Sequence, residues 1–234
     1  MARSPHGTRA DTTYERLRAD ILAGRLQPGE KLKFPELCER YGVGVGVVRE
    51  ALTRLVQRGL ASNQPHVGFQ VTPLSRADLI ELTDARVQIE CLVFRSAIEE
   101  GGTRWEADVV ATHHTLERTP LYDECDSERI SDSWAAAHSA FHHALIAGCP
   151  NRRLKEVADT MRDSSEIYHA WSQQTARHPD RDPVPEHRRL MELALARDVE
   201  SAVDELAVHI QRTTEMLLTS PLSNHPETSS TGLV

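Results

Sequence analysis

The sequence predicts a mostly α-helical protein in two parts: an N-terminal helix-turn-helix with a β-hairpin behind it, then an all-α bundle of six helices. Residues 42–59 hold apolar residues, from Val48 to Leu55, that recur at the helical period after a glycine-containing turn. From Ser75 onward, by contrast, no segment shows the apolar/polar alternation of a β-strand.

The first expected helix begins at one of residues 11–13 (Asp, Thr, Thr), which are all suitable N-caps, and runs to about Ala23 before Gly24 ends it. A Pro-Gly turn follows. Residues 34–41 (FPELCERY) then form a second, short amphipathic helix.

The third expected helix opens after Gly44 and ends at Gly59, and its Arg49, Arg54 and Arg58 lie off the apolar stripe. Two short helices joined by a glycine-containing turn, the second one basic, are the pattern of a helix-turn-helix. The alternative is an ordinary helical hairpin with solvated arginines.

Residues 60–71 favour the helix-turn-helix. They read as a short apolar piece, a polar turn at 63–66 that contains His66, and an alternating strand that starts at Gly68. A hairpin behind a helix-turn-helix is a wing. In such a domain the second helix of the motif enters the major groove of DNA, so Arg49, Arg54 or Arg58 could reach phosphates or guanine edges.

The charge distribution agrees with this division. The net charge is −8, but residues 1–72 hold 11 Lys and Arg against 7 Asp and Glu, while residues 73–234 hold 16 against 28. A basic N-terminal part joined to an acidic remainder indicates that the N-terminal part binds a polyanion. The four cysteines form no CxxC pair, and no stretch reads as a signal peptide or membrane span, so we expect a cytoplasmic protein with no membrane partner.

Pro73 marks the expected boundary between a DNA-binding domain (1–72) and a helical effector and dimerisation domain (73–220), followed by a disordered tail (221–234). The helices expected in the bundle are about 75–100, 104–118, 127–147, 152–175, 185–196 and 198–219.

Several short motifs resemble a known family. The runs PGEKL, REAL and RGL stand at the spacings of the winged-helix domain of the GntR family of bacterial transcription regulators. The bundle resembles the FCD-type effector domain, shared with the fatty-acid regulator of that family, through Arg86-x3-Glu90, Phe141-His142 and Asn151. Six helices rather than seven is similar to the family's vanillate-regulator branch.

The histidines are the candidate metal ligands. His138 and His142 are four residues apart and so share one face of a helix, a spacing suited to two ligands on one metal. The resemblance implies that His142, His187 and His209 fill the family's three histidine positions, while His138 stands where the family has aspartate. Four imidazoles favour a divalent transition metal, Zn²⁺ or Ni²⁺ rather than Mn²⁺; three histidines without His138 are the alternative.

The resemblance also implies that Arg86 and Asn151 bind the effector, and a guanidinium near a metal suits a small carboxylate. Arg86 paired with Glu90 or Asp84 at the surface is the alternative for the first residue. For Asn151 the alternative is a helix N-cap, because it follows Pro150 at the start of a helix.

The recognition helix departs from the family. Where the family has Ser or Thr, Arg, Thr and a small residue or Pro, this chain has Gly44, Val45, Gly46 and Val47. These side chains have no hydrogen-bond donors, and the glycines weaken the first helical turn by roughly 1 kcal/mol each. Selection of the operator sequence is therefore expected to depend on Arg49, on His66 and Gly68 of the wing, and on backbone amides.

These observations predict a homodimeric transcription regulator, more specifically a repressor, that binds a double-stranded DNA operator and responds to a small carboxylate. We do not expect an enzyme, since no carboxylate general base stands out beside the histidines. A metal-dependent helical-bundle enzyme is one alternative. The other is a regulator that has lost sequence-specific DNA binding and acts through a protein partner.

Overall fold

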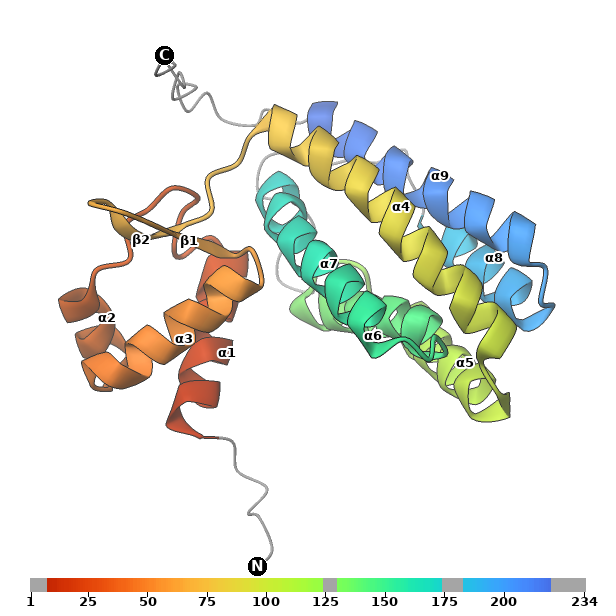
Figure 1. Ribbon diagram of the computed structural model, residues 1–234, viewed down its shortest axis with the longest axis horizontal. Helices are drawn as coiled ribbons and strands as arrows, with labels where there is room; N and C mark the ends of the chain where they lie inside the picture. The colour runs from red at the N-terminus through yellow and green to blue at the C-terminus, as the bar shows by residue number, and fades with distance from the viewer. Residues whose placement is uncertain (1–7, 124–129, 174–182, 220–234) are drawn as a thin grey trace, which may run out of the picture.

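The computed structural model describes residues 8–123, 130–173 and 183–219 (Figure 1). Within them lie a three-helix part with a two-stranded hairpin and a six-helix bundle, which confirms the predicted fold class. The elements are α1 Arg9–Leu22, α2 Phe34–Tyr41, α3 Val45–Gln57, β1 Ala61–Gln64, β2 Gly68–Val71, α4 Arg76–Glu100, α5 Thr103–Arg118, α6 Asp132–Ala147, α7 Arg152–Gln173, α8 Val184–Leu195 and α9 Val199–Thr219. The predicted tail lies outside the described residues.

The start of α1 differs from the prediction, because Thr8 and not one of residues 11–13 is the N-cap. The Asp11 N–H donates to Oγ1 of Thr8 (3.1 Å), and the Thr8 N–H donates to Oδ2 of Asp11 (2.7 Å). This reciprocal pair is a capping box. Asp11, one of the N-caps that the sequence pattern allowed, is therefore the third residue of α1.

The helix-turn-helix formed by α2 and α3 is confirmed. The apolar stripe of α3 is fully buried, with Val48, Ala51, Leu52 and Leu55 each 0% exposed. Gly59 lies just beyond its C-cap at φ +72°, in the left-handed region that favours glycine. Gly44 proves to be the N-cap of α3 and not an interior residue, so its cost is only a few tenths of a kcal/mol.

The predicted wing is also present. β1 and β2 pair antiparallel from Ala61↔Val71 to Gln64↔Gly68, and His66 stands in the connecting turn at φ +65°. The ring of Phe34, the first residue of α2, packs edge-on against Phe69 of β2, with centroids 5.9 Å apart. This contact fixes the wing against the helix-turn-helix.

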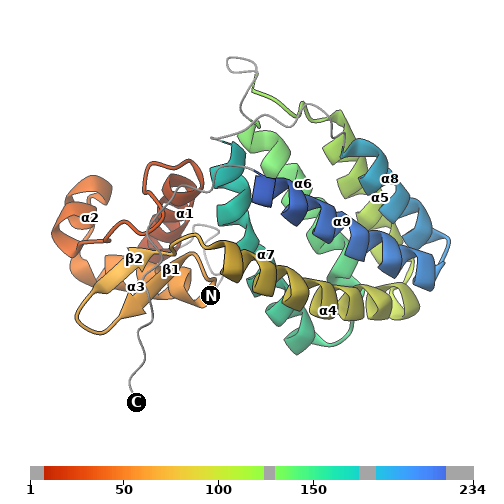
Figure 2. The same ribbon diagram turned by 90° about the horizontal axis from the view of Figure 1, so that it is seen from above.

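In the bundle, α4 and α9 run side by side in both views (Figures 1 and 2). α6 begins later than expected: the prediction started it at residue 127, but Ser131 is its N-cap and accepts a hydrogen bond from the Trp134 N–H at 3.1 Å. Before it, Ile130 forms an isolated β-bridge with Tyr122. Residues 124–129 lie outside the described part of the chain.

The two parts pack against each other through α7, which faces the winged part in Figure 1. The apolar core of the winged part continues onto the bundle, where Leu79, Ile167, Tyr168 and Leu217 belong to the same cluster. The approach is close at Gly59, where an added Cβ would collide with the side chain of Ser164. Because this contact is tightly packed, a displacement of α7 would also displace the winged part.

Candidate metal centre and nucleic-acid interface

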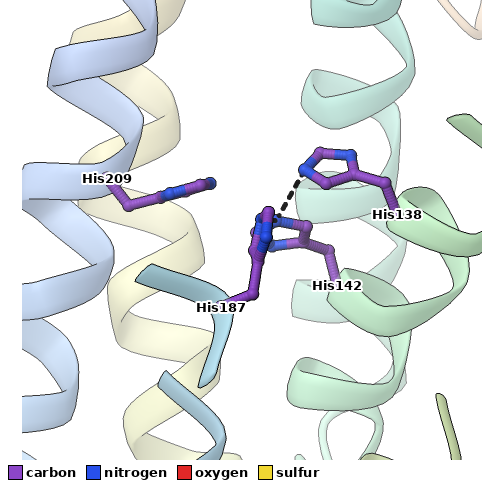
Figure 3. Close-up of side chains that lie close together, drawn as sticks. All are labelled: His138, His142, His187 and His209. Atoms are coloured by element: carbon purple, nitrogen blue, oxygen red, sulfur yellow. Dashed lines mark hydrogen bonds between the residues drawn. The ribbon is translucent and has the colours of Figure 1, made fainter. Parts of the chain in front are cut away.

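Four histidines from three helices converge inside the bundle (Figure 3). They are His138 and His142 of α6, His187 of α8 and His209 of α9, and one ring nitrogen from each lies within 4.8 Å of the others. Nε2 of His142 is 3.2 Å from Nε2 of His138 and 3.3 Å from Nε2 of His187. The structure thus brings together all four histidines that were predicted as candidate metal ligands.

Neighbouring side chains orient these rings. Trp134, one turn before His138 on α6, stacks on its ring with centroids 4.8 Å apart and planes at 16°. Nδ1 of His209 lies 2.7 Å from Oε2 of Glu186, as when an imidazole N–H donates to a carboxylate. That bond uses Nδ1, so Nε2 is the nitrogen of His209 that can act as a ligand. The sequence gave no signal for Glu186, because only the packing of α8 on α9 brings it to His209.

Two of the four imidazoles, those of His138 and His142, are held uncharged by their surroundings. Burial, and then the nearby positive charges, hold the pKa of His138 and His142 well below the usual value. For His142, the largest of those charges is Arg162. Neutral His138 and His142 keep the lone pair that a metal ion needs, so neither has to lose a proton at neutral pH.

The donor set fits a transition metal. Four nitrogens about 2.0–2.1 Å from one tetrahedral Zn²⁺ are roughly 3.3 Å from each other. The 3.2 Å and 3.3 Å separations around His142 match that spacing. Imidazole is a borderline ligand that suits Zn²⁺, Ni²⁺ and Cu²⁺, whereas Mn²⁺ prefers carboxylate oxygens.

A buried ionic group adjoins the cluster. Nε of Arg86 donates to Oε1 of Glu90 at 2.7 Å, and Nη1 of Arg162 on α7 lies 3.3 Å from Oε2 of the same carboxylate. All three residues are buried. Two guanidiniums therefore share one carboxylate, and Nε of Arg162 has no hydrogen-bond partner among the described residues. Glu166 and Asp159 also act electrostatically on Arg162, so the feature of this group that an anion would satisfy is the unpartnered Nε.

Of the two residues expected to bind the effector, Arg86 is buried in the bundle, as that role requires, whereas Asn151 is exposed. Arg86 is paired with Glu90, one of the two partners considered, but the pair is buried and not at the surface. Asn151 is exposed and caps α7, where its Oδ1 accepts from the N–H groups of Arg153 and Leu154. Arg162 was not anticipated, because the helical period alone did not indicate which arginine of α7 would turn inward.

Of the three arginines predicted for the candidate DNA surface, Arg49 and Arg58 are exposed and Arg54 is half-buried. Arg49 stands on the exposed face of α3, and its guanidinium lies over the Phe34 ring, 4.7 Å from the centroid. His66 is exposed in the turn of the wing, and Gly68 follows at φ +82°. Phe34 in turn contacts Phe69 of β2, so the arginine, the helix-turn-helix and the wing form one rigid surface.

Arg54 and Arg58 also form ion pairs within the protein, and their contact with DNA stays a prediction. Arg54 pairs with Asp11 of α1 at 2.6 Å and stacks over Tyr14, and Arg58 pairs with Asp163 of α7 at 2.9 Å. Arg54 is half-buried, while Arg58, the C-cap of α3, keeps 44% of its side chain exposed. The sequence showed that they lie off the buried stripe but not which residues they pair with.

These ion pairs belong to a charged seam between the two parts. Arg18 of α1 pairs with Glu166 of α7, whose Oε1 also accepts a hydrogen bond from the Ser139 hydroxyl at 3.3 Å. Burial raises the pKa of Glu166 above its usual value. Ser139 follows His138 on α6, so this seam reaches within one residue of the histidine cluster.

A winged helix-turn-helix joined to a helical bundle with a histidine cluster defines a class of protein, the DNA-binding transcription regulator. Comparison with known families agrees. The model of bacterial regulatory proteins of the gntR family matches residues 9–71, and that of the FCD domain matches residues 81–212. The chain belongs to the GntR family of transcription regulators and carries an FCD domain, which confirms the resemblance seen in its motifs.

Two curated relatives extend over most of the chain. It is 35% identical over 201 residues to the HTH-type transcriptional repressor GlaR of Escherichia coli K12, covering 84% of this chain and 90% of that protein. It is 36% identical over 203 residues to the uncharacterized HTH-type transcriptional regulator BphR of Paraburkholderia xenovorans LB400, covering 86% and 82%.

Solved structures support the fold. McbR/YncC of E. coli superposes with a TM-score of 0.74 at 21% identity, over 91% of this chain and 98% of that one. A putative GntR regulator from Rhodococcus sp. RHA1 gives 0.70 at 19%, over the same shares. Among the described helices, none is long and apolar enough to span a membrane.

Proposed function

We propose that the chain is a cytoplasmic, homodimeric repressor whose winged part binds a two-fold DNA operator and whose bundle binds a metal ion together with a small carboxylate. The observation that supports this most is the buried four-histidine cluster beside two guanidiniums that share a single carboxylate. A cation site next to a buried guanidinium N–H that has no partner among the described residues suits an anionic ligand that contacts both.

His142, His187 and His209, with His138 as the fourth ligand, would hold the metal, and Glu186 would fix the ring of His209. The bound ion would supply a Lewis-acidic position for one oxygen of the carboxylate. Zn²⁺ or Ni²⁺ suits this donor set better than Mn²⁺. Because Nε of Arg162 has no partner in the described residues, that side chain is the proposed anchor for the carboxylate, in place of Arg86 or Asn151.

The route from this site to DNA runs through α6 and α7. His138 and His142 lie on one face of α6, while Ser139 on another face donates to Glu166 of α7. Glu166 holds Arg18 of α1, so an anion that shifts α6 against α7 would change the placement of the winged part. That is a population shift between two arrangements of the dimer, biased by differential binding of the ligand.

Replacing Arg49 with alanine should weaken binding to the operator by about tenfold or more, because a bidentate arginine contact to guanine discriminates by about that much. Affinity of the wild type should also fall steeply with salt, because neutralised phosphates release counterions. Fluorescence anisotropy with an operator selected from random duplexes measures both effects.

Arg104→Ala is the matched control, since Arg104 is exposed on α5, far along the chain from the winged part. If Arg49→Ala binds the operator as tightly as wild type, the recognition surface is wrongly placed. If no sequence is enriched by selection, a regulator that acts through a protein partner is favoured instead.

Replacing His138 with aspartate should shift the preference of the site from Zn²⁺ toward Mn²⁺ by roughly tenfold, because a hard, charged oxygen replaces a neutral imidazole. His138→Ala should lower Zn²⁺ affinity without that shift. Elemental analysis after competition between the two ions measures the preference.

The control is His114→Asp, because His114 is an exposed histidine of α5. A three-histidine site is indicated instead if His138→Asp leaves the preference unchanged and His138→Ala binds as tightly as wild type.

A further inference from the structure

The exposed face of α3 begins with a valine. Val45 is 49% exposed, although the stripe of α3 from Val48 to Leu55 is fully buried. Arg49 lies four residues further on and therefore shares that face. In a helix-turn-helix, this end of the second helix is the part that meets base edges in the major groove.

The residues that flank Val45 leave its side chain prominent. Gly44 and Gly46 have no Cβ, and a Cβ built at either position would meet nothing within 4 Å. The first turn of α3 therefore presents valine methyl groups and backbone, without a hydrogen-bonding side chain. The open space around the two glycines also lets the backbone come close to a base pair.

An apolar side chain can distinguish bases in the major groove by one feature, the 5-methyl group of thymine. All other base-specific features of the groove are donors or acceptors, which valine cannot match. Arg49, on the same face, supplies the charge that draws this surface to DNA and the donors that recognise guanine. Side chains four apart on a helix have Cβ atoms about 5–6 Å apart, which corresponds to one or two base steps.

We propose that Val45 reads the 5-methyl group of a thymine in each half-site, one or two steps from the base pair contacted by Arg49. This inference rests on the proposed function and adds the chemistry by which the operator is chosen. It gives the Gly-Val-Gly-Val turn a role in recognition, whereas the sequence alone indicated only a loss of donors.

The test uses full-length, metal-loaded protein and an operator selected from random duplexes. Each thymine of the half-sites is then replaced by deoxyuridine, which removes the methyl group and leaves pairing intact. We expect a loss of about fourfold per half-site at one thymine, and about fifteenfold when both half-sites are changed, the effect of burying one methyl group each. Val45→Ala should bind the thymine and deoxyuridine operators with nearly equal affinity.

Val110→Ala is the matched control, because Val110 is an exposed valine of α5, and it should retain the full thymine preference. Equal binding of both operators by wild type would overturn the inference while leaving sequence-specific DNA binding intact. An unchanged thymine preference in Val45→Ala would overturn it as well. If selection enriches no sequence at all, the proposed function fails and this inference fails with it.

Discussion

Replacing Glu90 with alanine should lower the free energy of unfolding by about 3–5 kcal/mol. Glu90 is 2% exposed and is the carboxylate that Arg86 and Arg162 share. Without it, Arg86 and Arg162 would lose the carboxylate with which both pair inside the core, and breaking a buried ion pair in this way is strongly destabilising. Urea unfolding followed by circular dichroism gives the difference directly.

Glu99→Ala is the matched control, because Glu99 is exposed on the same helix and should change stability by less than about 0.5 kcal/mol. Equal urea midpoints for Glu90→Ala and wild type would show that the arginines do not depend on this carboxylate.

The effect of Glu90 should depend on pH. Burial alone raises the pKa of Glu90, but the charges of Arg162 and Arg86 and their hydrogen bonds outweigh it, so the pKa lies below its usual value. A lowered pKa means that this stabilisation is fully present above the unfolded-state pKa, about 4.3, and is lost as the pH falls through the folded-state value. The difference between wild type and Glu90→Ala should therefore shrink in acid.

Replacing His142 with alanine should lower Zn²⁺ affinity by about 100-fold or more, since even second-shell changes cost 10–100-fold. Nε2 of His142 is within 3.3 Å of two other candidate ligand nitrogens, so its loss opens the cluster at its centre. Competition with a chromophoric chelator measures the affinity. The thermal stabilisation of wild type by saturating Zn²⁺, about 4 kcal/mol at a thousand times Kd, should disappear in parallel.

The neighbouring His143 provides a close control. Its Nε2 lies 3.3 Å from Oδ1 of Asp159 on α7, outside the cluster, so His143→Ala should retain the metal. If His143→Ala loses as much affinity as His142→Ala, or if His142→Ala loses none, the four-histidine cluster is not the metal site.

The winged part could be predicted from the sequence because its signals are local. The apolar period from Val48 to Leu55, the left-handed position of Gly59 and the alternation after Gly68 each depend on residues within one turn or hairpin. The local prediction that was wrong is the N-cap of α1, a position for which two nearby residues are both suited. Thr8 and Asp11 can both cap a helix, and the capping box uses the second as the partner of the first.

The candidate site was predictable only in part. The spacing of His138 and His142 places both on one face of α6, but His187 and His209 were nominated through a family resemblance. Their approach depends on how α8 and α9 pack, which no local pattern encodes.

The same reason explains why the sequence did not indicate the contacts of several other residues. Glu186 and Arg162 acquire their roles from helices distant in sequence. Arg54 and Arg58 lie off the buried stripe as expected, yet they form ion pairs with Asp11 of α1 and Asp163 of α7. The helical period of the apolar residues predicts which side chains lie outside the core of their own domain. It does not predict which other helix or strand those side chains contact.

The most direct test of the whole proposal is the operator Kd of zinc-loaded protein, measured with each mono- and dicarboxylate of two to six carbons. We expect at least one acid to change Kd by fivefold or more in wild type, the size of a typical coupling between sites. The change should be lost in Arg162→Gln but kept in Arg188→Gln, whose exposed guanidinium pairs with Glu117. A panel in which no acid changes Kd, or an equal response in Arg162→Gln, would contradict an anion site in the bundle that controls DNA binding.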